Sequence, residues 1–390
     1  HGLLKSLPIT SSVIYLLFGI AIGDHGFGII QIHYLEDAKI IEVIAEITVI
    51  ISLFTVGLKL RLPLKDGRWL VPISLATVSM LITIFFLTIL SHYLLGFSWG
   101  EGILLGAILA PTDPVLASDV QVQHPGDHDP LKFALTSEGG INDGTAFPFV
   151  MLGLGLLGAE GKQWNFFNWL TVDLLWAVVC GFAVGMTAGL VISRLANFVR
   201  DIKKSYYLED FLTISSIAIS YGVAIQLKGY GFLAVFANAL TIRQIELKET
   251  GVVKRIFKRE LPDDVLSFNE QLERIFEVVS VVTIGLLIDF HSFKWSYLLF
   301  ALVLFFVIRP LATMTGMMKS SMTLKHKGLI SFFGIRGIGS LYYLYYALNH
   351  GLKTDHSIVF IQLTLWTILL SIFCHGIAVK PILKATKTHN

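Results

Sequence analysis

The sequence predicts an all-α, polytopic membrane protein. Of its 390 residues, 54% are hydrophobic and only 15% are charged, and the mean hydropathy is +0.70. Soluble domains contain about a quarter charged residues. A transmembrane helix needs about 20 mostly apolar residues, and about twelve such stretches follow one another along the chain. Too little sequence remains between them for a separate soluble domain.

Apolar runs bounded by charged residues, Gly and Pro define these helices, which are called the first to twelfth spans below. We expect them at 8–30, 38–60, 69–95, 100–120, 131–158, 166–200, 207–227, 230–246, 269–290, 294–319, 328–349 and 355–382.

Basic residues are concentrated in every second connection between the spans. Of the 30 Lys and Arg residues, 23 fall in one set of alternate connections and 5 in the other, while Arg309 and Arg336 lie within spans. Cytoplasmic loops are enriched in Lys and Arg. The pattern therefore supports about twelve spans in a cell membrane and predicts that both ends of the chain face the cytoplasm.

The fourth span carries an acid between two prolines, in the motif APTDP at 110–114. Proline lacks an amide hydrogen and clashes with the preceding turn, so the helix should break and leave unpaired carbonyls around Thr112 and Asp113. An ionisable group at membrane depth usually marks an ion path or a pair. A carboxylate beside free carbonyls predicts a cation site. The alternative is a kinked helix whose second half is capped by Asp113.

The fifth span contains SEGGINDGTAFPF at 137–149, with Glu138, Asn142 and Asp143 in otherwise apolar sequence. At about 100° per residue, Glu138 and Asn142 share a face, whereas Glu138 and Asp143 point about 140° apart. The two carboxylates should therefore have different roles. One can meet a fixed positive partner while the other faces water, and we favour Glu138 as the member of an ion pair.

The eleventh span places Arg336 among glycines, in GIRGIGSL at 334–341. This composition is typical of an interrupted helix. A buried guanidinium needs an internal acid, and Glu138 is the predicted partner. Arg309, in the middle of the tenth span, needs a partner too, and the sequence does not name one.

Spans three to five and ten to twelve form two similar triplets. The middle member is broken in each, by Pro in the fourth span and by Gly in the eleventh. Corresponding spans of the two triplets are seven positions apart in the order of spans. Because consecutive spans cross the membrane in opposite directions, an odd separation means that corresponding helices run in opposite directions. This predicts an inverted repeat with two broken helices crossing at the midplane, the usual plan of a secondary transporter site.

These motifs resemble those of the monovalent cation–proton antiporter superfamily, specifically the NhaP-like sodium/proton antiporters. The resemblance covers nearly the whole chain and also includes LFTVGLKL at 53–60 and the Arg309-Pro310 pair. It implies a thirteen-helix architecture whose first helix is missing from this chain. It also implies a homodimer, with dimerisation-domain helices at 1–65 and 201–293. The core (transport) domain would comprise 66–160 and 294–390, joined by a linking helix at 161–200.

At the site, the resemblance implies that Asp113 and Asp143 bind Na⁺ or protons in turn, with Thr112 offering its carbonyl. Asn142 would brace the broken helices. The structural residues of the core would be Asn142, Glu138 and Arg336, the last two as an ion pair.

Two departures from the family leave the cation preference open. Many relatives carry Ser directly after the Glu of the fifth span, where this chain has Gly139. Ser137, Thr136, water or backbone must then supply the ligand, and we favour Ser137. Some relatives also place Glu in the segment where this chain has Thr55 and Val56.

The predicted function is secondary active antiport of Na⁺ against H⁺ by alternating access. Asp113 and Asp143 would repel each other when both are ionised, so the empty site should favour a proton and the bound cation should replace it. If Glu138 stays ionised in its pair, only these two groups change state. The exchange would then be electroneutral, one proton for one cation.

Potassium/proton antiport on the same fold is the main alternative. A cation channel and an intramembrane aspartyl protease are more remote, since a protease would need paired aspartates on unbroken helices. We therefore predict a transporter and not an enzyme, with no cofactor beyond the transported ions. No GxxxxGK[ST] loop is present, which argues against a nucleotide. A net charge of +2 argues against nucleic acid as a partner.

Overall fold

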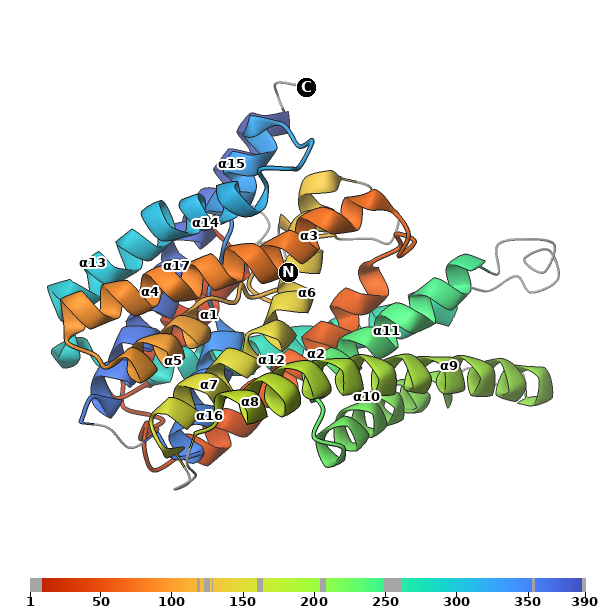
Figure 1. Cartoon of the computed structure of the whole chain (residues 1–390), viewed down its shortest axis with the longest axis horizontal. Helices are drawn as coiled ribbons and strands as arrows, with labels where there is room; N and C mark the ends of the chain where they lie inside the picture. Colours follow the sequence, from red (N-terminus) through yellow and green to blue (C-terminus); the bar gives the residue numbers. More distant parts are fainter. Residues whose placement is uncertain are drawn as a thin grey trace.

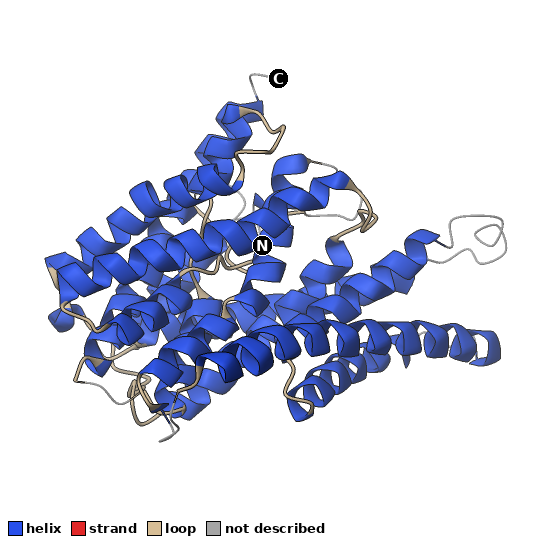
Figure 2. Ribbon diagram, in the orientation of Figure 1, coloured by secondary structure: helices blue, strands red, loops and turns tan. Residues whose placement is uncertain are grey.

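Helices form the scaffold of the protein. The computed structural model describes residues 9–117, 120–122, 127, 129–159, 164–203, 208–248, 261–352 and 355–387, and these residues contain no strand (Figures 1 and 2). The first half contains α1 (Ser11–Ile22), α2 (Ala38–Lys59), α3 (Leu70–Ser74), α4 (Met80–Leu95), α5 (Trp99–Leu109), α6 (Pro130–Thr145), α7 (Phe147–Leu156) and α8 (Phe166–Asn168). The second contains α9 (Ala177–Lys203), α10 (Leu208–Gln226), α11 (Gly231–Lys248), α12 (Leu261–Leu286), α13 (Trp295–Val303), α14 (Arg309–Gly316), α15 (Leu324–Phe332), α16 (Ile338–Asn349) and α17 (Ser357–Lys387).

Several of these helices join into longer runs through short π-helical segments, as α13 and α14 do through Leu304–Ile308. Every span expected from the sequence contains helix, so the all-helical prediction is confirmed for the described residues. Five runs there are long and apolar enough to cross a membrane: Ala38–Lys59, Gly67–Leu95, Phe166–Leu195, Trp295–Gly316 and Ser357–Ile382. The count of twelve spans, the inverted repeat and the domain boundaries stay predictions.

Side-chain caps fix where α5 and α6 begin. At the start of α5, the Ser98 hydroxyl accepts the Glu101 amide hydrogen at 3.3 Å, and the Glu101 carboxylate accepts that of Ser98 at 2.8 Å. At the start of α6, Asp129 accepts from the Leu131 amide at 2.8 Å, and Pro130 occupies the first turn. Both patterns satisfy amides that a helix start leaves free.

Helix α2 lies at the centre of the arrangement. It contacts α6, α11, α12 and α16, while α5 packs against α4, α7 and α16. In Figure 1, α9, α10 and α11 extend together beyond the rest of the molecule, and α4 packs against α14. Helix α6, which carries Glu138 and Asp143, contacts α2, α3, α11 and α15.

Helices α1 and α12 approach each other at backbone distance because glycines face one another. A Cβ on Gly285 would lie 2.5 Å from the Leu16 carbonyl oxygen, and one on Gly19 would lie 2.3 Å from that of Val282. Any side chain at either position would push the helices apart.

We therefore expect Gly285→Val to lower the free energy of unfolding by about 1–3 kcal/mol, the usual cost of overpacking. Thermal denaturation in detergent would measure this as a lower melting temperature. Gly222→Val is the matched control, since a Cβ on Gly222 would have no neighbouring atom within 4 Å. Equal melting temperatures for the two variants would contradict the close packing of α1 on α12.

Candidate functional site

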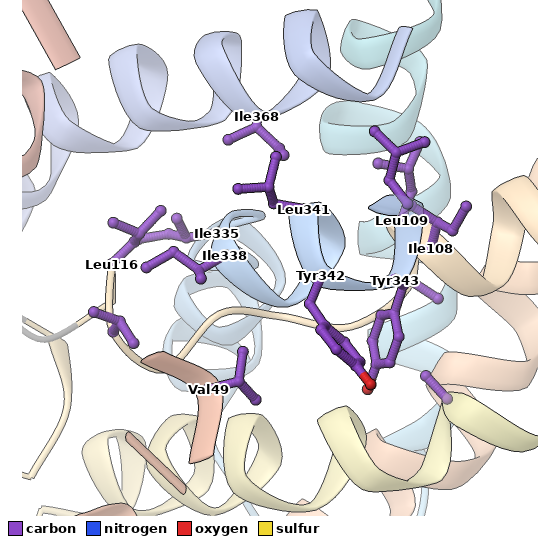
Figure 3. Packing of buried hydrophobic residues seen from close by; sticks show 14 of the residues in the cluster. Val49, Ile108, Leu109, Leu116, Ile335, Ile338, Leu341, Tyr342, Tyr343 and Ile368 are labelled. Atoms are coloured by element: carbon purple, nitrogen blue, oxygen red, sulfur yellow. The ribbon is translucent and has the colours of Figure 1, made fainter. Parts of the chain in front are cut away.

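Two interrupted helices meet at the centre of the protein. Helix α5 ends at Leu109 and is followed by a non-helical segment with Pro111 and Pro114, and α15 ends at Phe332 before α16 begins. We call residues 110–117 the first break and residues 333–337 the second break. The amide of Asp113 donates to the carbonyl oxygen of Ile335 at 2.8 Å, so the breaks touch. Figure 3 shows Leu116 of the first break beside Ile335 of the second. The interruption expected from Gly is present between α15 and α16, and the helix ends at the prolines as expected, without resuming in the described residues before α6.

The Asp113 carboxylate satisfies amides from both sides of this contact. Its Oδ1 accepts from the amides of Val115 at 2.8 Å and Leu116 at 3.1 Å, and its Oδ2 accepts from the amide of Ile338, the first residue of α16. The side chain is buried, and a Cβ on Gly337 would lie 2.5 Å from Oδ2, so only glycine permits this approach. Amide donors at a helix start favour an ionised carboxylate. Asp113 thus caps the turn that follows it, through Val115 and Leu116, as the alternative interpretation expected. It also caps the start of α16.

Asp143 lies in α6 opposite the same turn of α16. It is 1% exposed, and neither carboxylate oxygen has a hydrogen-bond partner among the described residues. A Cβ on Gly339 would lie 2.8 Å from its Oδ1, and the carboxylate interacts electrostatically with Asp113. The Tyr343 hydroxyl donates to the backbone carbonyl of Asp143. An ionised, buried carboxylate without a partner is costly, so Asp143 is suited to hold a proton or a cation.

The other predicted site residues lie close to these two carboxylates or within α6. Asn142 donates to the Thr112 hydroxyl at 2.9 Å, which ties α6 to the first break beside Asp113. The Ser137 hydroxyl is buried without a hydrogen-bond partner in the described ranges, so its role as a cation ligand stays a prediction. Thr136 is used differently, because its hydroxyl donates to the Lys132 carbonyl and accepts from the Val122 amide.

The predicted pair of Glu138 with Arg336 is wrong. Glu138 instead forms a two-pronged salt bridge with Arg309, from Nη1 to Oε1 at 2.6 Å and from Nη2 to Oε2 at 2.9 Å. Both side chains are almost fully buried. Arg309 begins α14, and its side chain passes so close to Gly334 that a Cβ there would lie 2.6 Å from Nε. Arg309, for which the sequence indicated no partner, is therefore the partner of Glu138.

Arg336 binds backbone instead of a carboxylate. Its guanidinium donates to the carbonyl oxygen of Pro111 at 2.7 Å and to that of Ala110, the carbonyls freed where α5 ends. Its own amide donates to the Ser371 hydroxyl at 2.8 Å. A helix C-terminus carries partial negative charge and unpaired carbonyls, so a guanidinium is stabilised there without an acid.

Comparison with known proteins identifies the family of the chain. The family described as "Sodium/hydrogen exchanger, transmembrane" matches residues 2–385. The chain belongs to this family. The resemblance to NhaP-like antiporters is thereby confirmed, and the chain is a multi-pass membrane protein.

Two relatives illustrate the range of the family. The chain is 25% identical over 383 residues to the K(+)/H(+) antiporter NhaP of Alkalimonas amylolytica, covering 96% of this chain and 62% of that protein. It is 27% identical over 233 residues to Na(+)/H(+) antiporter 2 of Zygosaccharomyces rouxii, covering 56% and 28%. The chain thus spans less than two thirds of the length of either relative.

A solved structure shares the fold. The sodium proton antiporter MjNhaP1 from Methanocaldococcus jannaschii at pH 8 superimposes with a TM-score of 0.75 at 21% sequence identity, over 96% of this chain and 92% of that one. At this identity the likeness establishes the fold alone.

The buried salt bridge yields a stability prediction. Glu138→Ala should lower the free energy of unfolding by about 3–5 kcal/mol, because it leaves the Arg309 guanidinium buried without its partner. Glu138→Ala/Arg309→Ala should recover part of that loss. Thermal denaturation of the single and double variants in detergent measures the coupling.

The exposed pair of Asp66 and Arg68 provides the control. Their contact at 2.9 Å joins side chains that are 29% and 49% exposed, so Arg68→Ala should leave the melting temperature nearly unchanged. Strictly additive losses at Glu138 and Arg309 would show that the buried pair is not coupled.

Proposed function

We propose that the protein is a secondary active antiporter of the cell membrane that exchanges a monovalent cation, with Na⁺ preferred, for H⁺. The observation that carries this proposal is the pair of buried carboxylates at the breaks. Asp113 is held by three amides, and Asp143 has no hydrogen-bond partner among the described residues. One site can therefore accept either a proton or a cation.

The two carboxylates explain how cation and proton compete. When both are ionised they repel each other across the first turn of α16, so the site favours a proton in the absence of a cation. A cation between Asp113 and Asp143 would offset that repulsion and release the proton. The Thr112 carbonyl and Ser137 are the further ligands we assign to it.

Alternating access would come from movement of the core domain (66–160 and 294–390) against the dimerisation domain. We assign a homodimer with both ends of this chain in the cytoplasm, as the distribution of basic residues indicates. The protein would act as a transporter and not as an enzyme, without a cofactor or a nucleotide.

Potassium/proton antiport is the second candidate, and two observations favour it. The relative aligned with 96% of the chain is named a K(+)/H(+) antiporter. In addition, a Cβ on Gly139 would lie 3.2 Å from the Pro114 side chain. The position where relatives place a serine therefore packs against the first break here and offers no side-chain ligand.

The decisive experiment measures proton movement in proteoliposomes that contain a quenched pH-sensitive dye. Adding Na⁺ or Li⁺ should dequench the dye in a saturable manner, and K⁺ should have a weaker effect. A larger response to K⁺ would assign the protein as a K⁺/H⁺ antiporter. Cation flux that does not saturate and moves no protons would indicate a channel and overturn the proposal.

Asp113→Asn and Asp143→Asn should each reduce exchange to the background of empty liposomes, because the amide neither balances the cation nor carries the exchangeable proton. The same dequenching assay measures the loss. Asp24→Asn, at an exposed turn, should exchange like the wild type. If either variant keeps near-native exchange with an unchanged melting temperature, that residue lies outside the site.

The fixed charges near the site lead to a prediction about stoichiometry. Glu138 is neutralised by Arg309, and Arg336 is held by carbonyls, so only Asp113 and Asp143 remain to change state. If both are ionised with Na⁺ bound and share one proton without it, the moving core carries the same charge in both directions. Exchange should therefore be electroneutral.

Na⁺ uptake into proteoliposomes at zero pH gradient tests this count, with the membrane potential set by valinomycin and potassium gradients. The potential should not drive accumulation, although each uncompensated charge would gain about 2.3 kcal/mol per 100 mV. Accumulation that follows the potential would contradict the one-for-one exchange and implicate another titrating group.

A further inference from the structure

Helix α2 carries two acidic side chains that the proposed exchange does not use. Glu42 and Glu46 lie one turn apart near the start of the helix, so both point from the same face. Glu42 is 3% exposed. A buried carboxylate is costly unless it is paired and hydrogen-bonded, so the partners of these side chains indicate their role.

Glu42 joins α2 to the end of α16. Its Oε2 accepts a hydrogen bond from Asn349 Nδ2 at 2.6 Å and lies 3.0 Å from Lys39 Nζ on its own helix. Asn349 is the last residue of α16, and the first residue, Ile338, donates its amide hydrogen to Asp113. The hydrogen bond therefore connects α2 to the helix that holds the candidate site.

A second link joins the same two helices one turn further along α2. The Tyr221 hydroxyl donates to Glu46, and the Tyr221 side chain also interacts with Tyr342 of α16. Tyr342 is 3% exposed, and its ring centre lies 5.4 Å from that of Tyr343. Tyr343 in turn donates to the backbone carbonyl of Asp143. A row of tyrosines thus leads from this link to the candidate site.

Both links join the two parts of the molecule that alternating access would move. Helix α2 belongs to the predicted dimerisation domain and α16 to the predicted core, and the two helices pack against each other. The connection 350–356 that follows Asn349 lies on the face that the basic residues predict to be external. At the opposite face, α1 and α17 are joined by a backbone bond from Thr10 to Gly376 at 3.1 Å. The links from α2 therefore belong to the external face.

We propose that Glu42 and Asn349 form a latch that closes the external face over the candidate site. Opening that face moves α16 away from its present position on α2, and the hydrogen bond must then break. The latch stabilises the state in which the site does not face outward. This inference rests on the proposed function, because only a transporter that alternates between two faces has to release it.

A covalent link between the two positions tests whether they must separate. Glu42→Cys/Asn349→Cys is made in a protein whose own cysteines, Cys180 and Cys374, are replaced by Ala, and is treated with a short bis-methanethiosulfonate reagent. Asn349 is exposed, so the reagent can reach it. Exchange in proteoliposomes should fall to the background of empty liposomes in the linked protein and return when the link is reduced.

The matched control is another contact of α2. The hydroxyls of Thr48 and Ser280 lie 2.7 Å apart, but this contact joins α2 to α12 inside the dimerisation domain. The linked Thr48→Cys/Ser280→Cys protein should exchange equally before and after reduction. Undiminished exchange by fully linked Glu42→Cys/Asn349→Cys, or failure of the reagent to link that pair, would overturn the proposal.

Substitutions of Asn349 test the direction of the effect without any cysteine. Asn349→Ala removes the donor, so more molecules should face outward. The apparent KM for the cation should fall on the external side by about two- to tenfold, the range expected for one hydrogen bond, and should stay the same or rise on the internal side. Asn349→Asp places a second carboxylate against Glu42, so the external KM should fall further. Membrane vesicles of the two orientations measure each side separately.

The outcomes separate the latch from the proposed function. Thr48→Val should change neither KM. An equal change on both sides for Asn349→Ala would mean a merely structural residue and would overturn the latch, as would an external KM that rises. If the wild type exchanges and the linked protein exchanges equally, the latch alone fails. If the wild type shows no cation-driven proton movement, the proposed function fails and the latch with it.

Discussion

The structure depends on how two helix interruptions satisfy each other inside an apolar environment. Each break exposes backbone amides and carbonyls that lipid cannot pair. The first break supplies a carboxylate for the amide that begins α16, and the second supplies a guanidinium for the carbonyls that end α5. A direct bond between Asp113 and Ile335 joins the two segments. Because each break provides the partner that the other lacks, neither would be stable alone.

Helix α6 is fixed by two contacts that lie one turn apart on the same face. Asn142 reaches the first break through Thr112, and Glu138 reaches α14 through Arg309. Glycines at 337 and 339 then allow α16 to approach the two aspartates more closely than any other residue would permit. The carboxylates of Asp113 and Glu138 are thus hydrogen-bonded. That of Asp143 has no hydrogen-bond partner in the described part of the chain.

The sequence predicted the helical class, both breaks and the residues near them, because Pro, Gly and isolated charges in apolar runs have direct consequences for backbone pairing. It failed on which arginine meets Glu138. Two buried guanidinium groups were available for one acid, and the choice depends on distances that only tertiary packing sets. The bonds from Arg336 and Tyr343 end on backbone carbonyls, which every residue carries, so no side-chain pattern could reveal them.

The charges gathered around the breaks have a consequence for ion valence. Arg309 and Arg336 are balanced by Glu138 and Asp113, and Asp143 adds one negative charge beyond that balance. On the proposed function, a single proton or a single monovalent cation would bring this group to neutrality at membrane depth. A divalent ion such as Ca²⁺ would leave one positive charge uncompensated, which is costly in that environment. If Asp143 holds the transported ion as proposed, the charges of these five side chains would favour a monovalent ion over a divalent one.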